Sequence, residues 1–190
     1  MFRKIFISLT VLGIVSCTNA NLKEDKNKLQ ATKNVSIHKA LKEFNKYGVI
    51  FEYPEDYLIE ERIIEEGHYY KVYLDINDDT KLQSVQIEWR NNPLKYDPIN
   101  GRQGGKEAVM NYYGNQVEVL EEYETSLNGN VVYWIDYLIN KYCGQYIMKS
   151  GVTMIDDQVF VIQKISWIDD EFEEADKIFE SIRGSKSDTK

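Results

Sequence analysis

The sequence predicts an α+β domain in which an antiparallel β-sheet is flanked by helices on both faces, an α/β/α sandwich. Three observations support this prediction. Repeated runs between residues 58 and 167 alternate in the two-residue period of strands. The run 131–140 is apolar on both of its faces, so it needs one layer above it and another below. Apolar residues recur at helical spacing at the start, middle and end of the same region.

Residues 1–16 have the pattern of an export signal. Arg3 and Lys4 precede an apolar run that ends at Val15. This run is well short of the ~20 residues that a membrane-spanning helix needs. The signal therefore directs export without forming a permanent transmembrane anchor.

The end of this signal, IVSC at residues 14–17, resembles the lipobox of bacterial lipoproteins. The resemblance implies that Cys17 becomes the N-terminal residue and carries acyl chains. Two or three such chains hold a protein at a membrane far more firmly than one. Thr18 follows where many lipoproteins of the inner membrane have aspartate, so by resemblance the outer membrane is favoured, on its periplasmic or surface face. The alternative is an ordinary signal cleaved after Ala20, with Cys17 discarded.

The remaining chain divides into a tether, one domain and a tail. Residues 17–34 contain no aromatic residue and form a flexible tether, about 20 to 25 Å from end to end. Residues 35–184 are enough for a single domain with a real core. Residues 185–190 are predicted to be a disordered tail.

Charge and cysteine content exclude several functions. The formal net charge is −8, and an acidic chain does not suit nucleic acid, whose phosphates demand a basic surface. The same acidity repels anionic lipid headgroups, so membrane contact must come from the lipid anchor and not from charge. If Cys17 is acylated, Cys143 is the only thiol left and no internal disulfide forms; if it is not, a bridge between the two is open. No motif indicates a cofactor or a metal ion.

The first half of the domain is expected to begin with a helix. Ser36 is a candidate N-cap, and Gly48 a candidate C-cap, for a helix that ends at Tyr47. Residues 49–53 follow as a strand, and Pro54 indicates that it lies at a sheet edge. Three further strands are predicted at 58–65, 69–76 and 82–89, the last of them half exposed.

The second half alternates a helix with long strands. A helix is predicted over 104–113, because Ala108 and Tyr112, and Val109 and Tyr113, are four residues apart. Strands are predicted at 117–125, 131–140, 146–155 and 159–167. A last helix over 170–183 has an apolar stripe and an acidic first turn, which the helix dipole favours.

Two stretches of this pattern resemble PsbP-like domains. Residues 47–57, YGVIFEYPEDY, are similar to the family's opening of glycine, alternating aromatic residues and Tyr-Pro-x-Asp-Trp, with Tyr57 in place of the tryptophan. Residues 178–182, IFESI, are similar to the end of its terminal helix. The fold occurs in the PsbP subunit of photosystem II, in a Ran-binding nuclear import factor and in many bacterial lipoproteins. The resemblance implies binding as the common activity and transfers no functional residue.

Two local motifs have competing interpretations. Asp75, Asn77 and Asp79 copy the first ligands of a calcium loop, but Thr80 replaces the required glycine, so a polar turn is favoured. Residues 101–106, GRQGGK, enter the predicted helix and could present amides and two cations to an anion, although the Walker spacing is missing.

The longest irregular stretch, residues 90–103, is the candidate partner surface. Binding residues gather in long loops on rigid scaffolds. Asn91, Tyr96 and Arg102 are its candidate contacts, and a plain connection is the competing interpretation.

The leading hypothesis is a lipid-anchored binding module of the cell envelope, whose partner is a protein. It would be an accessory subunit of a larger complex or an immunity-type inhibitor. One alternative is an envelope hydrolase that uses paired carboxylates, and another is a carrier of a small apolar ligand. Against an enzyme, the chain has two histidines only, His38 and His68, and no nucleophile motif.

Overall fold

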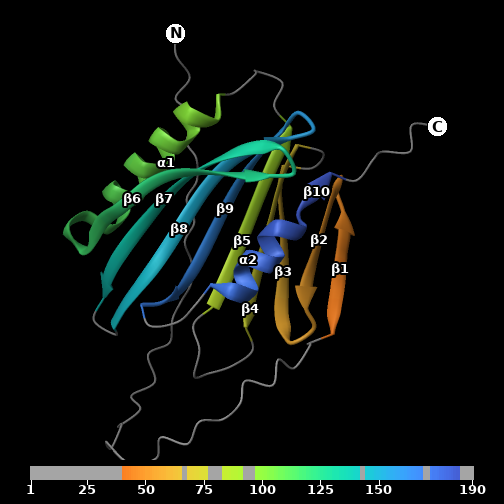
Figure 1. The fold of residues 1–190 in the computed structure, drawn as a ribbon, viewed down its shortest axis with the longest axis horizontal. Coiled ribbons are helices and arrows are strands. Elements are labelled where there is room, and N and C mark those ends of the chain that lie inside the picture. Colours follow the sequence, from red (N-terminus) through yellow and green to blue (C-terminus); the bar gives the residue numbers. More distant parts are fainter. Residues whose placement is uncertain are drawn as a thin grey trace, which may run out of the picture.

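A seven-stranded antiparallel sheet forms the centre of the fold (Figure 1). The structure is a computed structural model that describes residues 40–65, 68–76, 83–91, 97–141, 144–168 and 172–184. The strands of this sheet run in the order β3-β4-β5-β9-β8-β7-β6. Their bounds are β3 Tyr57–Glu65, β4 Tyr69–Ile76, β5 Gln83–Asn91, β6 Val117–Leu127, β7 Asn130–Lys141, β8 Gly144–Ile155 and β9 Gln158–Trp167.

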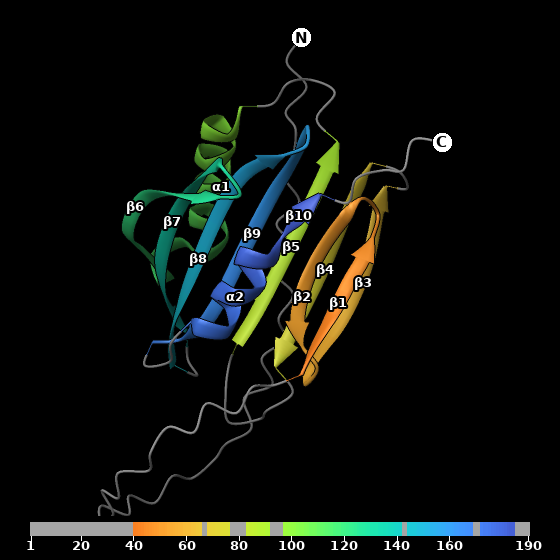
Figure 2. The ribbon, with the colours of Figure 1, turned by 45° about the vertical axis from the view of Figure 1, so that its right-hand side comes forward.

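A smaller sheet of three strands packs on the large one (Figure 2). It consists of β1 (Leu41–Lys46), β2 (Val49–Pro54) and β10 (Arg183–Gly184), with β2 in the middle. Phe44 and Phe51 stack at a centroid distance of 4.6 Å. They belong to a continuous apolar core that also contains Trp89 and Trp134 of the large sheet.

Two α-helices complete the described part. Helix α1 (Pro98–Tyr113) contacts β6, β7 and β8, and helix α2 (Glu173–Ser181) contacts β2 and β5. The α+β class and the antiparallel sheet are therefore confirmed. Within the residues that the structure describes, neither helix has the length and apolar character to cross a bilayer.

Strand β7 is buried through both of its faces, as predicted. Trp134 lies in the core that includes α2, and its ring contacts Phe179 at 5.2 Å between centroids. The next residue, Ile135, lies in a separate cluster with Val109 and Tyr113 of α1. Successive side chains of a strand point to opposite sides, so β7 contributes to both clusters.

The prediction of a helix that ends at Tyr47 is wrong for the described residues, because residues 41–46 form strand β1. Tyr47 and Gly48 have φ values of 55° and 81°. Two consecutive positive φ angles make a two-residue type I′ turn, which reverses the chain into a hairpin. Gly48 therefore serves a turn and not a helix cap. The small sheet supplies part of the layer that the sandwich prediction assigned to a helix.

Three other predictions also differ from the structure. The last helix, predicted over 170–183, spans Glu173–Ser181 in the described residues, and Arg183 belongs to strand β10. The strand after Gly48 is not at an edge, because β10 pairs with β2 on the side away from β1. Helix α1 begins at Pro98, six residues early, because Asp97 accepts a hydrogen bond of 3.0 Å from the Ile99 backbone N–H and caps it. The remaining strands agree with the predictions to within two residues.

Candidate functional site

One transverse row of the large sheet is polar across five strands. Its members are successive register neighbours on β3, β4, β5, β9 and β8, and they are Glu60, Tyr73, Gln86, Gln163 and Ser150. Gln86 and Gln163 are 5% and 1% exposed. Buried polar side chains require hydrogen-bond partners, so the partners of this row decide what the row can do.

A buried ion pair lies beside the row. Lys71 Nζ is 2.6 Å from Glu88 Oε1, and the two side chains are 2% and 4% exposed. The Tyr69 hydroxyl donates to the other oxygen of Glu88. Burial, followed by the charge of Glu88, raises the pKa of Tyr69. The pair therefore has no net charge, and Glu88 accepts hydrogen bonds only.

This carboxylate determines the orientation of both glutamines. Gln86 Nε2 donates to Glu88 Oε1 at 2.7 Å and to Gln163 Oε1 at 3.0 Å. Since an ionised carboxylate cannot donate, Gln86 must present its nitrogen to it. Gln163 in turn presents its oxygen to Gln86. Its own Nε2 is buried, and within the described part of the protein it has no hydrogen-bond partner.

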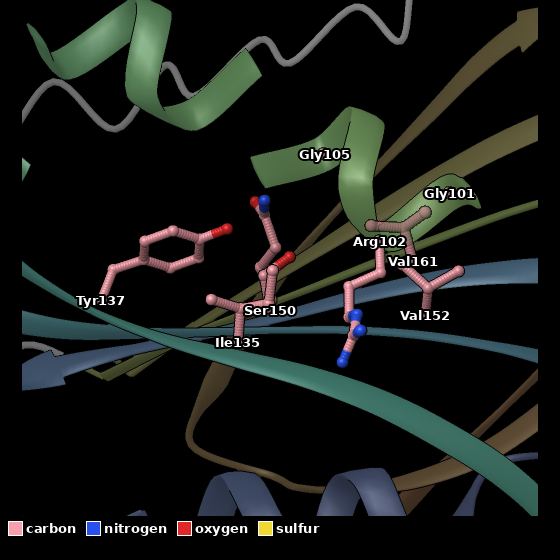
Figure 3. Close-up of a pocket in the computed structure, with 9 residues that line it drawn as sticks. Gly101, Arg102, Gly105, Ile135, Tyr137, Ser150, Val152 and Val161 are labelled. Carbon is pink, nitrogen blue, oxygen red and sulfur yellow. The ribbon is translucent and has the colours of Figure 1, made fainter. Parts of the chain in front are cut away.

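Gln163 lines a small hollow between α1 and the sheet (Figure 3). The cavity volume is about 10 Å³. Its walls are Gly101, Arg102, Gly105, Ile135, Tyr137, Ser150, Val152, Val161 and Gln163. The hollow exists because two glycines, one helical turn apart, leave α1 without side chains where it faces the polar row. In Figure 3 the Tyr137 hydroxyl points toward the space above Ser150, and the Arg102 guanidinium points away.

The two cations near the hollow share one carboxylate, so the cluster keeps one net positive charge. Arg102 Nη2 is 3.6 Å, and Lys106 Nζ 2.5 Å, from the carboxylate of Glu122. The hydrogen bond from Lys106 lowers the pKa of Glu122, and burial raises the pKa of Tyr137. At neutral pH the Tyr137 hydroxyl therefore keeps its proton. Apart from Arg102, whose guanidinium points away (Figure 3), the hollow combines uncharged hydrogen-bonding groups with apolar walls.

The predicted partner residues lie on different elements. Asn91 is the last residue of β5 and accepts a hydrogen bond of 3.3 Å from Gln158 Nε2. Arg102 lies within α1 and on the hollow wall. Tyr96 is outside the described residues. Residues 98–103, expected as loop, are helical, so the irregular stretch is shorter than predicted.

The anion-binding interpretation of GRQGGK is wrong. These residues start three positions into α1, not before it. Backbone amides that far into a helix bond to carbonyls of the preceding turn, and only the first amides of a helix are free. His68 is exposed in the turn before β4. Cys17, His38, Asn77, Asp79 and Cys143 lie outside the described residues.

The polar row itself was not predicted. The β5 strand was expected to expose Gln86 and Glu88, but both are buried. The signal that could have found it is the opposite charge of Lys71 and Glu88, which are direct register neighbours on β4 and β5. That pairing becomes visible only once the strand register is known.

Comparison with solved structures assigns the architecture. The solution structure of cyanobacterial PsbP from Synechocystis superposes with a TM-score of 0.55 at 14% identity, over 83% of this chain and 99% of that one. The fold is PsbP-like. The likeness at this identity concerns the PsbP-like fold alone. The sequence matches no family model and no curated protein sequence.

Two further structures are similar at lower scores. LpqN, involved in cell envelope biogenesis of Mycobacterium tuberculosis, has a TM-score of 0.48 at 15% identity, over 77% of this chain and 91% of that one. A protein of unknown function from Pseudomonas aeruginosa has a TM-score of 0.41 at 10% identity, over 72% and 91%. The PsbP-like assignment does not depend on either.

Proposed function

We propose that this protein is a non-enzymatic binding module of the bacterial cell envelope, held there by acyl chains on Cys17. The observation that carries the proposal is the buried Gln163 amide, which offers an unused donor to a hollow on a PsbP-like scaffold. A donor of this kind recognises a ligand but neither attacks nor protonates it at neutral pH.

The carboxylates support binding over hydrolysis. A general acid of a hydrolase needs a carboxyl group whose pKa is raised. In the described part of the chain, the carboxyl pKa shifts that are resolved are downward, at Glu122 and Glu173, each caused first by a hydrogen bond from lysine. Glu88 is neutralised by Lys71 at 2.6 Å. The cavity volume of about 10 Å³ also gives no support to a carrier of an apolar molecule.

The anchor at Cys17 is tested by metabolic labelling. Cells that express the full chain are grown with labelled palmitate, with and without globomycin, which blocks the lipoprotein signal peptidase. We expect label in the wild-type chain, accumulation of the precursor under globomycin, and neither effect for Cys17→Ala. Unlabelled, freely soluble protein, or a chain cut after Ala20, would refute the anchor.

The binding function is tested by recovering the partner from detergent-solubilised membranes. We expect a partner protein in stoichiometric amount. Because this chain is acidic, the partner is expected to bind it through a basic surface. Asn91, Tyr96 and Arg102 are the proposed contacts, so Asn91→Ala and Arg102→Ala should weaken the recovery, whereas Lys177→Ala on an exposed face of α2 should not. Recovery of no partner under gentle detergents would contradict the proposal.

A further inference from the structure

The unpartnered nitrogen of Gln163 is a consequence of the buried network and not an arbitrary rotamer. Glu88 requires the Gln86 nitrogen, and that nitrogen occupies the Gln163 oxygen at 3.0 Å. Rotating the Gln163 amide by half a turn would place two NH₂ groups against each other. Because Gln163 also lines the hollow, this nitrogen is the group of the network that an occupant of the hollow could accept a hydrogen bond from. A buried donor without a partner destabilises the folded state, so it is expected to be retained for an occupant.

The shape of the hollow limits the size of that occupant. A Cβ atom added at Gly105 would meet no other atom within 4 Å. The volume of about 10 Å³ accommodates roughly one water molecule, or the tip of a larger group. Ile135, Val152 and Val161 provide apolar walls around that tip. The part of the occupant that enters the hollow is therefore a single polar atom, and the group that carries it is uncharged.

The surrounding charges select a neutral occupant. Lys71 is paired with Glu88, whereas Arg102 and Lys106 share the single carboxylate of Glu122 and leave one positive charge there. The Arg102 guanidinium points away from the hollow (Figure 3), so an anion placed beside Gln163 would lose its hydration without direct contact with a cation, which is unfavourable. Besides Arg102, the polar residues that line it are Gln163, Ser150 and Tyr137, and each of them can donate a hydrogen bond. A carbonyl oxygen suits them, because it accepts two hydrogen bonds and brings no proton of its own.

We propose that the hollow between α1 and strands β7, β8 and β9 binds the carbonyl oxygen of a neutral amide or ester ligand, with Gln163 Nε2 as its donor. A single water molecule fills the same place in the free protein and is displaced on binding. The inference rests on the binding function proposed above, and it names the chemical class that this site recognises.

The test uses N-methylacetamide as the probe and acetate as a charged control of similar size. The full ¹⁵N-labelled chain is titrated in detergent and followed by ¹H–¹⁵N spectra. The Gln163 side-chain signal is identified by its loss in Gln163→Met. We expect saturable shifts of this signal and of the Gly101 and Gly105 amides with N-methylacetamide, and only linear, non-saturating shifts with acetate.

Two glycine variants of the same helix form a matched pair. Gly105→Leu fills the hollow, whereas Gly104→Leu adds the same side chain one residue away, where a Cβ atom also meets nothing within 4 Å. We expect Gly105→Leu to weaken probe binding at least tenfold and Gly104→Leu to leave it unchanged. If Gly105→Leu does not fold, Gly105→Ala and Gly104→Ala replace the pair, with a smaller loss expected at residue 105.

Three results would overturn the assignment. The first is shifts that never saturate with N-methylacetamide, which would leave the hollow as a water site only. The second is binding of acetate as tight as that of N-methylacetamide. The third is binding of the probe by Gly105→Leu as tight as by the wild type. Each is distinct from failure of the general function. A partner recovered from membranes alongside a negative titration would remove this site and leave the binding module in place.

Discussion

Gln86 donates to Gln163 across the β5–β9 pair at 3.0 Å, and the Gln163 nitrogen has no partner among the described residues although Gln163 lines a hollow. Both residues are buried members of the polar row, and the Lys71–Glu88 ion pair lies beside them. An ion pair between β4 and β5 thereby sets the orientation of the Gln163 amide on the next strand, β9.

Replacing Gln86 should therefore destabilise the fold. Gln86→Met removes the partner of Gln163 Oε1 and one of the donors to Glu88. We expect a loss of about 1–3 kcal/mol in the free energy of unfolding, measured with urea. Gln103→Met, at an exposed position of α1, should change it by less than about 0.5 kcal/mol. Equal effects of the two substitutions would contradict the network.

The Lys71–Glu88 pair should show strong coupling in a double-mutant cycle. Lys71→Met leaves Glu88 as an uncompensated buried charge, and we expect a loss of about 3–5 kcal/mol. The double variant Lys71→Met with Glu88→Met should recover much of this loss, because no charge then remains buried. Urea unfolding of the four proteins measures the coupling, and additive single effects would show that the pair is not a unit.

Stability should fall at alkaline pH because of buried tyrosines. Burial is the first cause of the raised pKa of Tyr57, Tyr69, Tyr123 and Tyr137, and neighbouring carboxylates add to it. The unfolded chain releases these protons near pH ~10, whereas the folded protein retains them. Stabilisation is thus complete below about pH 10 and is lost as the pH rises further.

Phenolate absorbance recorded together with circular dichroism measures this effect. We expect the four tyrosines to ionise only as the strand signal disappears. Tyr69→Phe should make the decline of stability with pH less steep, while Tyr112→Phe, at a position that is 57% exposed, should leave it unchanged. Phenolate formation by these four residues in a fully folded protein would disprove the expectation.

The turn between β1 and β2 should depend on a glycine. Gly48 has φ of 81°, and a Cβ atom there would lie 3.6 Å from Gln158 Nε2, an ordinary contact. The cost of Gly48→Ala is therefore conformational, and we expect about 1–2 kcal/mol of destabilisation. Gly104→Ala, inside α1, should instead stabilise the protein by up to about 1 kcal/mol. Thermal or urea unfolding of the two variants measures whether their changes in stability have these opposite signs.

Packing of Trp134 should depend on the absence of a side chain at Gly151. The two residues are register neighbours on β7 and β8, and a Cβ atom at 151 would lie 2.7 Å from the indole ring. We expect Gly151→Ala to cost about 1–3 kcal/mol. Adding Trp134→Phe should cost less in this variant than in the wild type, because the smaller ring relieves the clash. Equal costs in both backgrounds would argue against the contact.

Local patterns predicted much of the fold. The alternation in β4, β5, β7, β8 and β9 located these strands to within two residues, because the two-residue period is a local property of extended backbone. The start of the domain was misassigned because Leu41 and Phe44 have helical spacing, whereas strand β1 places them on opposite faces and leaves Leu41 exposed. The type I′ turn at Tyr47 and Gly48 decides between helix and strand, and a single glycine after an aromatic residue also suits a helix end.

The sequence by itself determined the α+β class, the antiparallel strands and the apolar stripe of the last helix, because periodicity and turn residues act over a few positions. It also carries the lipobox at Cys17, which remains a prediction. Only the tertiary structure decided that Lys71, Glu88, Gln86 and Gln163 are buried together, and that Gly101 and Gly105 of α1 line a hollow beside Gln163. These residues come from distant strands, and their contacts depend on strand order and register, which no local pattern specifies.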